Sequence, residues 1–429
     1  MLDLNAFLHV FYSVAAFIFN AFFLIAFTIS LIYVVMLFFV LLTRKNEFRE
    51  KSFNKVKVPK VSIHIPTRNE LAALTCAEAC LNFDYPQDKF EILIGDDSDQ
   101  PAVSKQLQNF ASQYKDKVHV FQRETNIGYK AGNLNNLISH STGEIFVIFD
   151  SDFIPGVDFL KRIVTPFIDS TVCAVQARWK PKNARQNIIS TLSANIVEVF
   201  HHVMMPFMQS ITGTVVICGS AEAVRKSYLI ESGNWQNGSL TEDIEYSFRL
   251  IRNNQKIVYL PDLECECEVP FKSKDLYRQQ MRWAYGVISA LKQHIVPTFL
   301  GRIPLFRKLS LIMASIGYLL TLILEILFIS GFLKLSGIFI FPAESIFVLL
   351  AQTLVYVLLT VGPLLVAVWV LFLTKKSDQS LRLLLSTFSF GLLTIYYVNI
   401  GIYKALMNKP MQWFLVTKSG NERVALSSK

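Results

Sequence analysis

The sequence predicts an α/β domain with membrane helices on both sides of it. Apolar residues make up 52% of the 429 residues, and they are concentrated at the two ends of the chain. Between these ends, residues 46–305 carry charge at the level of a soluble protein, and short β-branched runs alternate there with longer helical patterns. Such alternation is typical of a mainly parallel sheet that helices cover on both faces.

The N-terminal membrane segment is predicted at residues 1–45. Its apolar run, 7–43, is longer than the ~20 residues that cross a bilayer and too short for two such helices. We therefore expect one span near 22–43, preceded by an interfacial or tilted segment, with Asn20 near the junction. The run is too long for a signal peptide and lacks the basic start of one.

The middle domain, 46–305, carries apolar runs of strand length and polar residues that follow three of them. The polar sequences are HIPTRNE, LIGDDSD and VIFDSDF. In open parallel sheets, ligands bind at the carboxyl ends of the strands, so these sequences mark the expected site. The predicted strands are 61–65, 90–95, 117–121, 144–149, 173–177, 213–219 and 256–260.

Three apolar stretches predict a C-terminal membrane region at 306–405, followed by a basic tail at 406–429. If the last stretch crossed the membrane, the tail would lie outside, against the preference of basic residues for the cytoplasm. We therefore expect one of the three stretches to be interfacial or re-entrant. The basic flanks of the other stretches predict a cytoplasmic middle domain. The stretches are 309–333, 345–373 and 381–405, and the flanking residues are Arg44, Lys45, Arg302, Arg307, Lys308, Lys375 and Lys376.

The net charge of +9 does not require a nucleic-acid partner, because much of it flanks membrane segments, where lipid headgroups are the natural counter-charge. The six cysteines suggest neither a disulfide framework nor a zinc site. Cys265 and Cys267 lack a second pair of ligands, and we interpret them as ordinary core or edge residues.

Asp150 and Asp152 follow a buried apolar run, one residue apart. Two carboxylates at the end of a strand are hard oxygen ligands suited to Mg²⁺ or Mn²⁺, and such a cation would neutralise a diphosphate. An acidic turn explains the pattern equally well.

Asp96 and Asp97 are a second acidic pair at the end of a predicted strand. They could hydrogen-bond a base or ribose, or they could form a simple turn. Lys130, at a helix start within NIGYKAGNLNN, is placed to meet a diphosphate, although the sequence is not a P-loop.

Two helical patterns complete the set of candidates. In LTEDIEYSFRL, Thr241 is the expected N-cap residue, and acids follow it in the first turn, which the helix dipole alone favours. The functional alternative is that one of these acids is a general base. In YRQQMRWAYG, Gln279, Arg282 and Trp283 share one helix face. There Arg282 could clamp a phosphate and Trp283 could stack on a sugar, or the helix could simply lie on the membrane surface.

The order of these motifs along the chain resembles that of the family 2 membrane glycosyltransferases, which include cellulose, hyaluronan and glucomannan synthases. The motifs are Asp-Asp, D-S-D, T-E-D and Q-Q-M-R-W. The resemblance covers about residues 61–290. It implies a GT-A fold, inverting transfer from a nucleotide sugar, and a divalent metal held by Asp150 and Asp152. It implies Asp243 as the general base. The resemblance also implies a nucleotide-sugar pocket lined by Thr67, Glu70, Asp96, Asp97, Lys130 and Asn133, and an acceptor and diphosphate side lined by Cys218, Gly219, Ser220, Glu242, Gln279, Arg282 and Trp283.

The function predicted in this way is transfer of a hexose from UDP-glucose, a similar UDP-hexose or GDP-mannose to a growing β-linked polysaccharide. Transfer of a single sugar to a lipid acceptor is the alternative within the same enzyme class. An inactive scaffold or a transporter is the alternative outside it. Glu325 is the only acid in the stretch 309–333, and a transporter or polymer channel could use it to line a sugar path.

Overall fold

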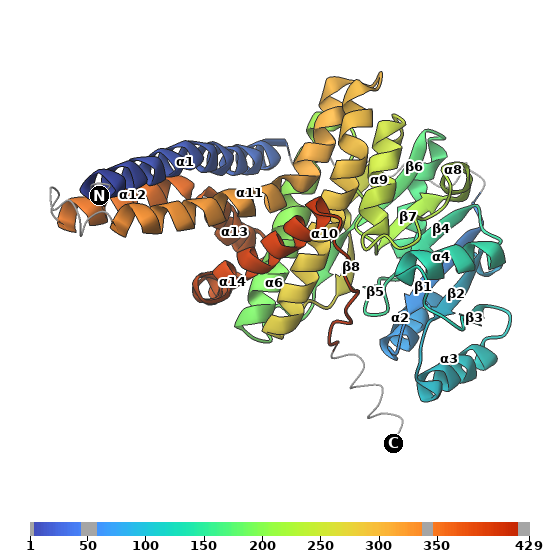
Figure 1. The fold of residues 1–429 in the computed structure, drawn as a ribbon. Helices are drawn as coiled ribbons and strands as arrows, with labels where there is room; N and C mark the ends of the chain where they lie inside the picture. Colours follow the sequence, from blue (N-terminus) through green and yellow to red (C-terminus); the bar gives the residue numbers. More distant parts are fainter. Residues whose placement is uncertain (1–3, 44–57, 337–345, 419–429) are drawn as a thin grey trace.

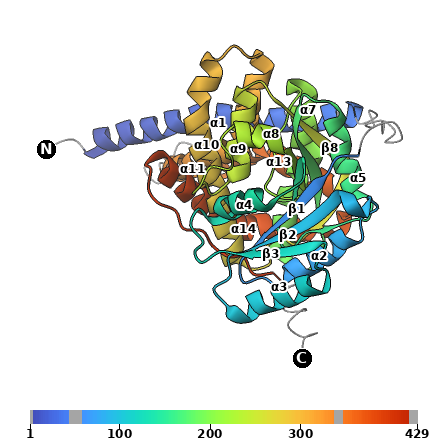
Figure 2. The ribbon, with the colours of Figure 1, turned by 90° about the vertical axis from the view of Figure 1, so that its right-hand side faces the viewer.

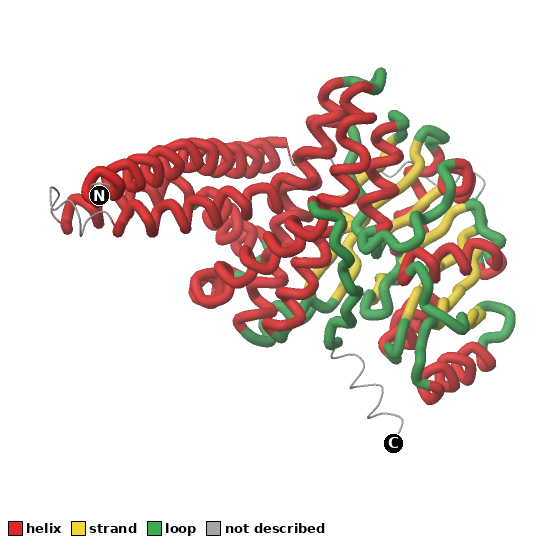
Figure 3. The backbone as a smooth tube through the Cα atoms, in the orientation of Figure 1, coloured by secondary structure: helices red, strands yellow, loops and turns green. Residues whose placement is uncertain are grey.

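The computed structural model describes residues 4–43, 58–336 and 346–418. The strands and their covering helices occupy one half of the molecule, and long helices without strands extend from it (Figures 1 and 3). The predicted fold class, an α/β domain flanked by apolar helices, is therefore confirmed. The exact domain boundaries stay predictions.

Within the described ranges the strands form one eight-stranded sheet in the order β3-β2-β1-β4-β7-β6-β8-β5. The sheet is mixed rather than mainly parallel. Strand β1 pairs in parallel with β2 and β4, but β7 runs antiparallel to both β4 and β6, and β5 runs antiparallel to β8. The strands are β1 (Val61–Thr67), β2 (Phe90–Asp96), β3 (Val118–Gln122), β4 (Ile145–Ile148), β5 (Ile154–Pro155), β6 (Val172–Pro181), β7 (Glu222–Arg225) and β8 (Lys256–Cys267).

Helices cover both faces of the sheet, as predicted, and each face has its own apolar core. Alternate residues of β4 enter opposite cores: Val147 belongs to the core on the side of α2, α3 and α5, whereas Phe146 belongs to the core on the side of α4, α9 and α10. Figure 2 shows α4 and α2 on different sides of β1 and β2. The helices of this domain are α2 (Ala72–Leu81), α3 (Pro101–Gln113), α4 (Tyr129–His140), α5 (Phe159–Val164), α8 (Lys226–Glu231), α9 (Glu242–Arg252) and α10 (Ser273–Leu300), with short 3₁₀ turns at Gln87–Lys89 and Thr165–Ile168.

The predicted strand at 213–219 is wrong, because this stretch is a buried loop that precedes β7. Its apolar residues fit a strand pattern, yet its backbone donates to polar side chains instead of to a neighbouring strand. Local side-chain partners of this kind replace a sheet ladder. The bonds run from Ile217 N–H to Ser247 Oγ (2.9 Å), from Cys218 N–H to Gln176 Oε1 (2.7 Å) and from Gly219 N–H to Glu222 Oε2 (2.6 Å).

At the N-terminus, a single helix, α1 (Leu4–Thr43), runs without a break through Asn20, and the position of the membrane span within it stays a prediction. It lies beside α11 (Figure 1). By length and composition, four helices of the described residues could span a membrane, and one bent pair could be a fifth span or a re-entrant loop. The predicted basic flank at Arg44 and Lys45 lies outside the described residues.

The C-terminal helices are where the sequence predicted them. The predicted stretch 345–373 is divided into α12 and α13, which meet at an angle of 55°. This bend suits the expectation that one stretch is not a simple span. An apolar segment that the prediction overlooked, Ile188–Thr212, is interrupted by a π-helical turn at Phe200–Met204 and packs between the sheet and the long helices. The remaining elements are α6 (Ile188–Val199), α7 (Met205–Thr212), α11 (Leu305–Ser336), α12 (Ile346–Thr360), α13 (Gly362–Leu373), the 3₁₀ turn Ser377–Gln379 and α14 (Ser380–Leu406).

Candidate active site

A pocket of about 170 Å³ lies where β1 and β4 end. The chain runs outward from β1 through β2 to β3 and then returns to β4 on the other side of β1, which makes this edge the switch point of the sheet. Helices α9 and α10 and the extended segment 411–418 complete its wall. Residues from the polar sequences that follow β1, β2 and β4 therefore meet at one place, together with the start of α9.

The D-S-D sequence forms the floor of this pocket. Phe149 is fully buried and ends the apolar run, and the backbone N–H of Asp150 donates to Ser220 Oγ at 2.9 Å. This bond turns the chain so that both Asp150 and Asp152 line the pocket. Ser220 itself is buried behind the lining, where it supports the loop.

Two lysines hold these carboxylates. Lys130, from α4, lies 2.6 Å from Asp150 Oδ1 and 3.4 Å from Glu242 Oε1. Burial lowers the pKa of Lys130, but Asp150 and Glu242 outweigh it, and the net pKa is raised. The ammonium is therefore a fixed positive charge between the D-S-D loop and the start of α9.

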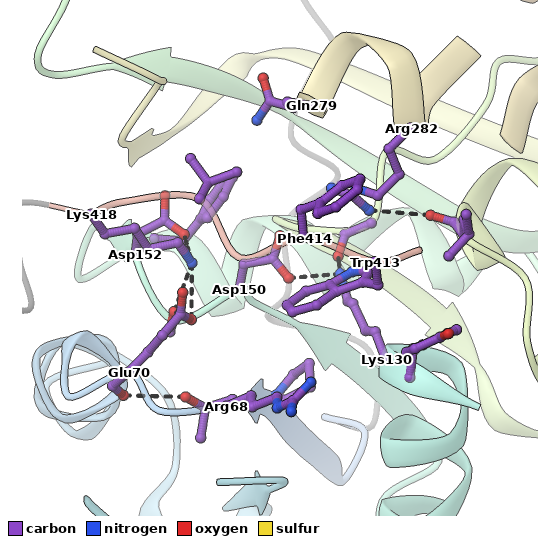
Figure 4. Close-up of a pocket in the computed structure, with 18 of the residues that line it drawn as sticks. Arg68, Glu70, Lys130, Asp150, Asp152, Gln279, Arg282, Trp413, Phe414 and Lys418 are labelled. Atoms are coloured by element: carbon purple, nitrogen blue, oxygen red, sulfur yellow. Dashed lines mark hydrogen bonds and ion pairs between the residues drawn. The ribbon is translucent and has the colours of Figure 1, made fainter. Parts of the chain in front are cut away.

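Lys418, from the C-terminal segment, neutralises the other carboxylate. Its Nζ lies 2.8 Å from Asp152 Oδ1 and 3.0 Å from Glu70 Oε2, and it donates to Ser151 Oγ at 2.9 Å (Figure 4). Burial lowers the pKa of Lys418, and the two carboxylates raise it by more. A cation already stands where the sequence predicted a metal.

The donor set at the D-S-D loop still fits a divalent metal. Within the described ranges no group of three or more His, Cys, Asp or Glu is close enough to form a complete protein cage. Mg²⁺ and Mn²⁺ need no such cage, because they are commonly held by one or two carboxylates together with phosphate oxygens and water. Asp150 and Asp152 supply this number of carboxylates beside a pocket.

Asp243 lies in the first turn of α9 and lines the same pocket as Lys130 and Asp150. Burial, followed by repulsion from Glu242, raises the pKa of Asp243 to about 7. Burial also raises the pKa of the neighbouring Glu222, again with repulsion from Asp243. A carboxylate whose pKa lies near neutrality is suited to accept a proton at neutral pH.

Gly219 brings the preceding loop against Asp243 and Lys130. Its φ is +85°, and a Cβ at this position would lie 3.1 Å from Asp243 Oδ2 and 3.2 Å from Lys130 Nζ. The carbonyl of Gly219 also accepts a hydrogen bond from Lys130 Nζ. Only glycine allows the backbone to adopt this conformation and approach this closely. Cys218 and Gly219 both line the pocket.

Helix α10 supplies the third wall through Gln279, Arg282 and Trp283, which line the pocket together as their helical spacing predicts. Arg282 donates to the carbonyl of Leu240 at 3.2 Å, in the loop that leads into α9. The rings of Trp283 and Trp179 lie 6.4 Å apart between centroids and form an aromatic margin.

The predicted nucleotide residues separate into two groups. Thr67, Glu70, Asp97 and Asn133 line the pocket together with Lys130, and Asp97 forms an ion pair of 2.5 Å with Arg123. Asp96 is buried behind them, where its Oδ1 accepts the backbone N–H of Ser98 at 2.9 Å.

The C-terminal segment contributes residues that the sequence analysis treated only as a basic tail. Trp413 and Phe414 line the pocket together with Lys418 (Figure 4). The backbone N–H of Thr417 donates to Asp275 Oδ2 at 3.1 Å, and the guanidinium of Arg278 lies 4.7 Å from the centre of the Phe414 ring. Helix α10 thus holds this segment in place. Adjacent aromatic residues at 413 and 414 were the available signal. The rest of the predicted tail lies outside the described residues.

Comparisons with known proteins agree with this geometry. The chain is 28% identical over 278 residues to "Probable glucomannan 4-beta-mannosyltransferase 9" and 29% identical over 248 residues to "Glucomannan 4-beta-mannosyltransferase 1", both of Oryza sativa subsp. japonica. These matches cover 62% and 56% of this chain and about half of each relative, 52% and 47%.

A solved mannosyltransferase, PcManGT from Pyrobaculum calidifontis in complex with GDP-Man and Mn²⁺, has the same fold, with a TM-score of 0.63 at 19% identity. That comparison covers 94% of this chain and all of the other. The family described as "Glycosyltransferase like family 2" matches residues 59–286, which is more than half of the chain and contains every predicted site residue. The protein is therefore a member of glycosyltransferase family 2 with a GT-A catalytic domain.

Proposed function

We propose that the protein is a membrane-embedded inverting hexosyltransferase that uses a nucleotide sugar as its donor. One observation carries this proposal: the D-S-D loop, Asp243 and the Gln279–Arg282–Trp283 face all line a single pocket at the switch point of the sheet. A donor diphosphate would lie on the Asp150 side of Lys130, and an acceptor would approach on the Asp243 side.

The residues of the chain support each part of the transfer. Asp243, as a carboxylate, would accept the proton of an acceptor hydroxyl, which makes that oxygen a better nucleophile. Attack from the face opposite the leaving nucleotide inverts the anomeric carbon. Lys130 and Arg282 would stabilise the negative charge that develops on the departing diphosphate.

Asp150 and Asp152 would hold a Mg²⁺ or Mn²⁺ ion together with oxygens of the donor. When bound, the ion supplies further neutralisation of the leaving diphosphate. Lys418 competes for the same Asp152 carboxylate, from 2.8 Å, so its ammonium must share that carboxylate with the metal or leave it. The Mn²⁺ in the complex of PcManGT is consistent with this role.

Among hexose donors, GDP-mannose now ranks ahead of UDP-glucose. The two rice relatives are named as mannosyltransferases, and the solved protein of the same fold is a mannosyltransferase in complex with GDP-Man. The sequence motifs alone allowed both donors, because several hexoses fit them.

The apolar helices and the basic residues beside them support a multi-pass membrane protein whose catalytic domain faces the cytoplasm. The contacts of Glu325, the residue that a transporter could use to line a sugar path, do not support the transporter alternative. The Glu325 carboxylate accepts a hydrogen bond from Asn399 Nδ2 of α14 and lines neither pocket described for this molecule.

A donor panel tests the proposal. Purified protein is supplied with UDP-glucose, UDP-N-acetylglucosamine or GDP-mannose in the presence of Mn²⁺, and released nucleotide is measured. We expect one donor, GDP-mannose, to give at least about tenfold more release than the others. Binding without release from any of them would favour the inactive scaffold, and release of UDP alone would overturn the preference for mannose.

A further inference from the structure

A second cavity, of about 640 Å³, begins at Asp243 and extends among the long helices. Its wall comes from α1, α6, α10, α11, α12, α13 and α14. Thr241, Asp243, Cys218 and Trp283 line both this cavity and the donor pocket. The predicted general base therefore stands at the boundary between the two spaces.

The lining of this cavity is mostly apolar, and its polar members are nearly all uncharged. It contains no lysine, arginine or glutamate from the part of the chain that the structure describes, and Asp243 is its one carboxylate. Four cationic residues, Arg68, Lys130, Arg282 and Lys418, line the donor pocket and not this cavity.

Five of the polar side chains that line the cavity are already hydrogen-bonded within the protein, whereas Gln280 and Tyr318 add further polar groups to the lining. Each of four threonines donates to a carbonyl of its own helix, and an asparagine amide donates to a neighbouring helix. They therefore offer few donors to a ligand. The bonds are Thr321 to Tyr318 O (2.6 Å), Thr360 to Tyr356 O, Thr387 to Leu383 O and Thr394 to Phe390 O (each 2.8 Å), and Asn195 Nδ2 to Ala367 O (2.9 Å).

These features suit an alkyl or acyl chain and not a sugar chain. A polysaccharide in this space would leave many hydroxyl groups without partners, and each such buried group costs free energy. An apolar chain needs no partners and gains from burial. Most of the wall consists of helices with the length and composition of membrane spans, so a cavity between them suits a ligand that comes from a bilayer.

The reacting end of the lipid is indicated by the charges at the boundary. An acceptor phosphate would meet Asp243, with Glu222 and Glu242 nearby, and it would need no base. An acceptor hydroxyl needs a base, and Asp243 provides one. The hydroxyl of Thr241 is buried at the same boundary without a hydrogen-bond partner, which leaves it free to bind a second hydroxyl.

We propose that the acceptor is a hydroxyl-bearing lipid, whose apolar tail occupies this cavity and whose hydroxyl lies at Asp243. This inference rests on the proposed function and narrows it, because it prefers the lipid acceptor over the growing polysaccharide that the sequence favoured. The polysaccharide becomes one outcome of the test.

The test uses alkyl β-D-mannosides with chains of one to twelve carbons, each below its micellar concentration, and the full-length protein with its preferred donor. The proposal predicts that kcat/KM rises by up to about fourfold per added methylene, the ratio that ~0.8 kcal/mol represents, until the cavity is filled. A rate that does not depend on tail length, together with better transfer to soluble manno-oligosaccharides, would overturn it. Preferred transfer to a polyprenyl phosphate would overturn the assignment of a hydroxyl.

A matched pair of variants locates the tail. Leu364 lines the cavity, whereas the adjacent Leu365 does not and is 55% exposed on the same helix. Leu364→Trp should lower kcat/KM for dodecyl mannoside by at least tenfold and leave methyl mannoside unchanged. Leu365→Trp should change neither. Equal effects of the two variants on dodecyl mannoside would contradict the placement.

Binding without turnover separates this inference from the proposed function. Trp179 and Trp283 line the boundary, so tryptophan fluorescence of Asp243→Asn should report occupancy by dodecyl mannoside even when no transfer occurs. Binding that strengthens with tail length supports the lipid cavity even if the donor chemistry proves wrong. Absence of such binding overturns the cavity assignment, whatever the donor panel shows.

Discussion

The two spaces on either side of Asp243 are built from opposite kinds of residue. The donor pocket is crossed by ion pairs, with Lys130 between Asp150 and Glu242 and Lys418 between Asp152 and Glu70. The cavity beyond Asp243 is mostly apolar and has no lysine, arginine or glutamate among its described lining residues. In the proposed function, charge would therefore fix the position of a charged donor, and the apolar volume would be left for an uncharged acceptor.

The contrast explains how one carboxylate can have a pKa near neutrality so close to several cations. Asp243 faces the apolar space, and its burial raises its pKa to about 7. Lys130 and Arg282 lower that pKa, but their charges are already shared with Asp150 and Glu242. The boundary between the two spaces is thus where a general base can work.

The largest effect should come from Asp243→Asn, which removes the base at the boundary. We expect kcat to fall by about 10²–10⁴-fold, while binding of the nucleotide sugar is largely retained because the donor side is intact. Nucleotide release and donor binding by calorimetry measure the two quantities. Asp262→Asn, at an exposed position on β8, is the control and should behave as wild type. A variant with weak donor binding and normal turnover at saturating donor would contradict the role as base.

Removal of divalent metal should impair binding and departure of the nucleotide diphosphate and should leave acceptor binding unchanged. With excess EDTA we expect at least about a hundredfold loss of transfer, restored by added Mn²⁺. Asp150→Asn and Asp152→Asn should weaken the dependence on Mn²⁺ in the same assay. Full activity in EDTA would remove the metal role and leave Lys130 and Lys418 as the cations of the site.

The pH dependence should follow Asp243. Below pH 7 the protonated acid cannot accept a proton, so kcat/KM should fall by about tenfold per pH unit. In the free enzyme, burial and the repulsion from Glu242 both raise this pKa, so Glu242→Gln should move the acid limb to lower pH. The wild type and Glu242→Gln are assayed side by side from pH 5 to 8. The same acid limb in both proteins would point to a different titrating group.

The same raised pKa predicts an effect on stability. Between about pH 4 and pH 7 the folded protein holds a proton on Asp243 that the unfolded chain has lost, so this group lowers the free energy of unfolding as the pH rises. Asp243→Asn removes that dependence and should raise the Tm at pH 8 by a few degrees relative to wild type. Thermal unfolding at pH 5 and pH 8 measures the difference.

The sequence predicted most of the residues that line the charged pocket, because that pocket is made from short motifs. Asp150, Lys130, Asp243 and Arg282 each lie in a pattern whose order along the chain is informative, and the parallel strands bring their ends together. The acceptor cavity has no such motif. It arises from the packing of several helices, and a lining leucine such as Leu364 looks in sequence like its exposed neighbour Leu365.

The errors in the predicted fold have the same origin. The stretch 213–219 has the apolar pattern of a strand, but Gln176, Glu222 and Ser247 supply the partners for its backbone from distant or later positions. Lys418 lies 267 residues from Ser151, and a lysine in a basic tail carries no mark of the pocket it enters. Long-range polar contacts of this kind are decided by tertiary structure and not by local preference.

The smallest effect should come from substitution of a glycine, and it tests the contacts at the boundary between the two spaces. Gly219 and Gly233 both have positive φ, +85° and +95°, so alanine at either position should cost about 1–2 kcal/mol of stability. A Cβ at Gly233 meets nothing within 4 Å, whereas one at Gly219 meets Asp243 and Lys130. Gly219→Ala should therefore lower kcat by about tenfold or more through displacement of these two groups, and Gly233→Ala should leave kcat unchanged. Thermal unfolding and kcat measured together distinguish the shared strain from the specific contact, and equal kcat values for the two variants would show that Asp243 and Lys130 tolerate the displacement.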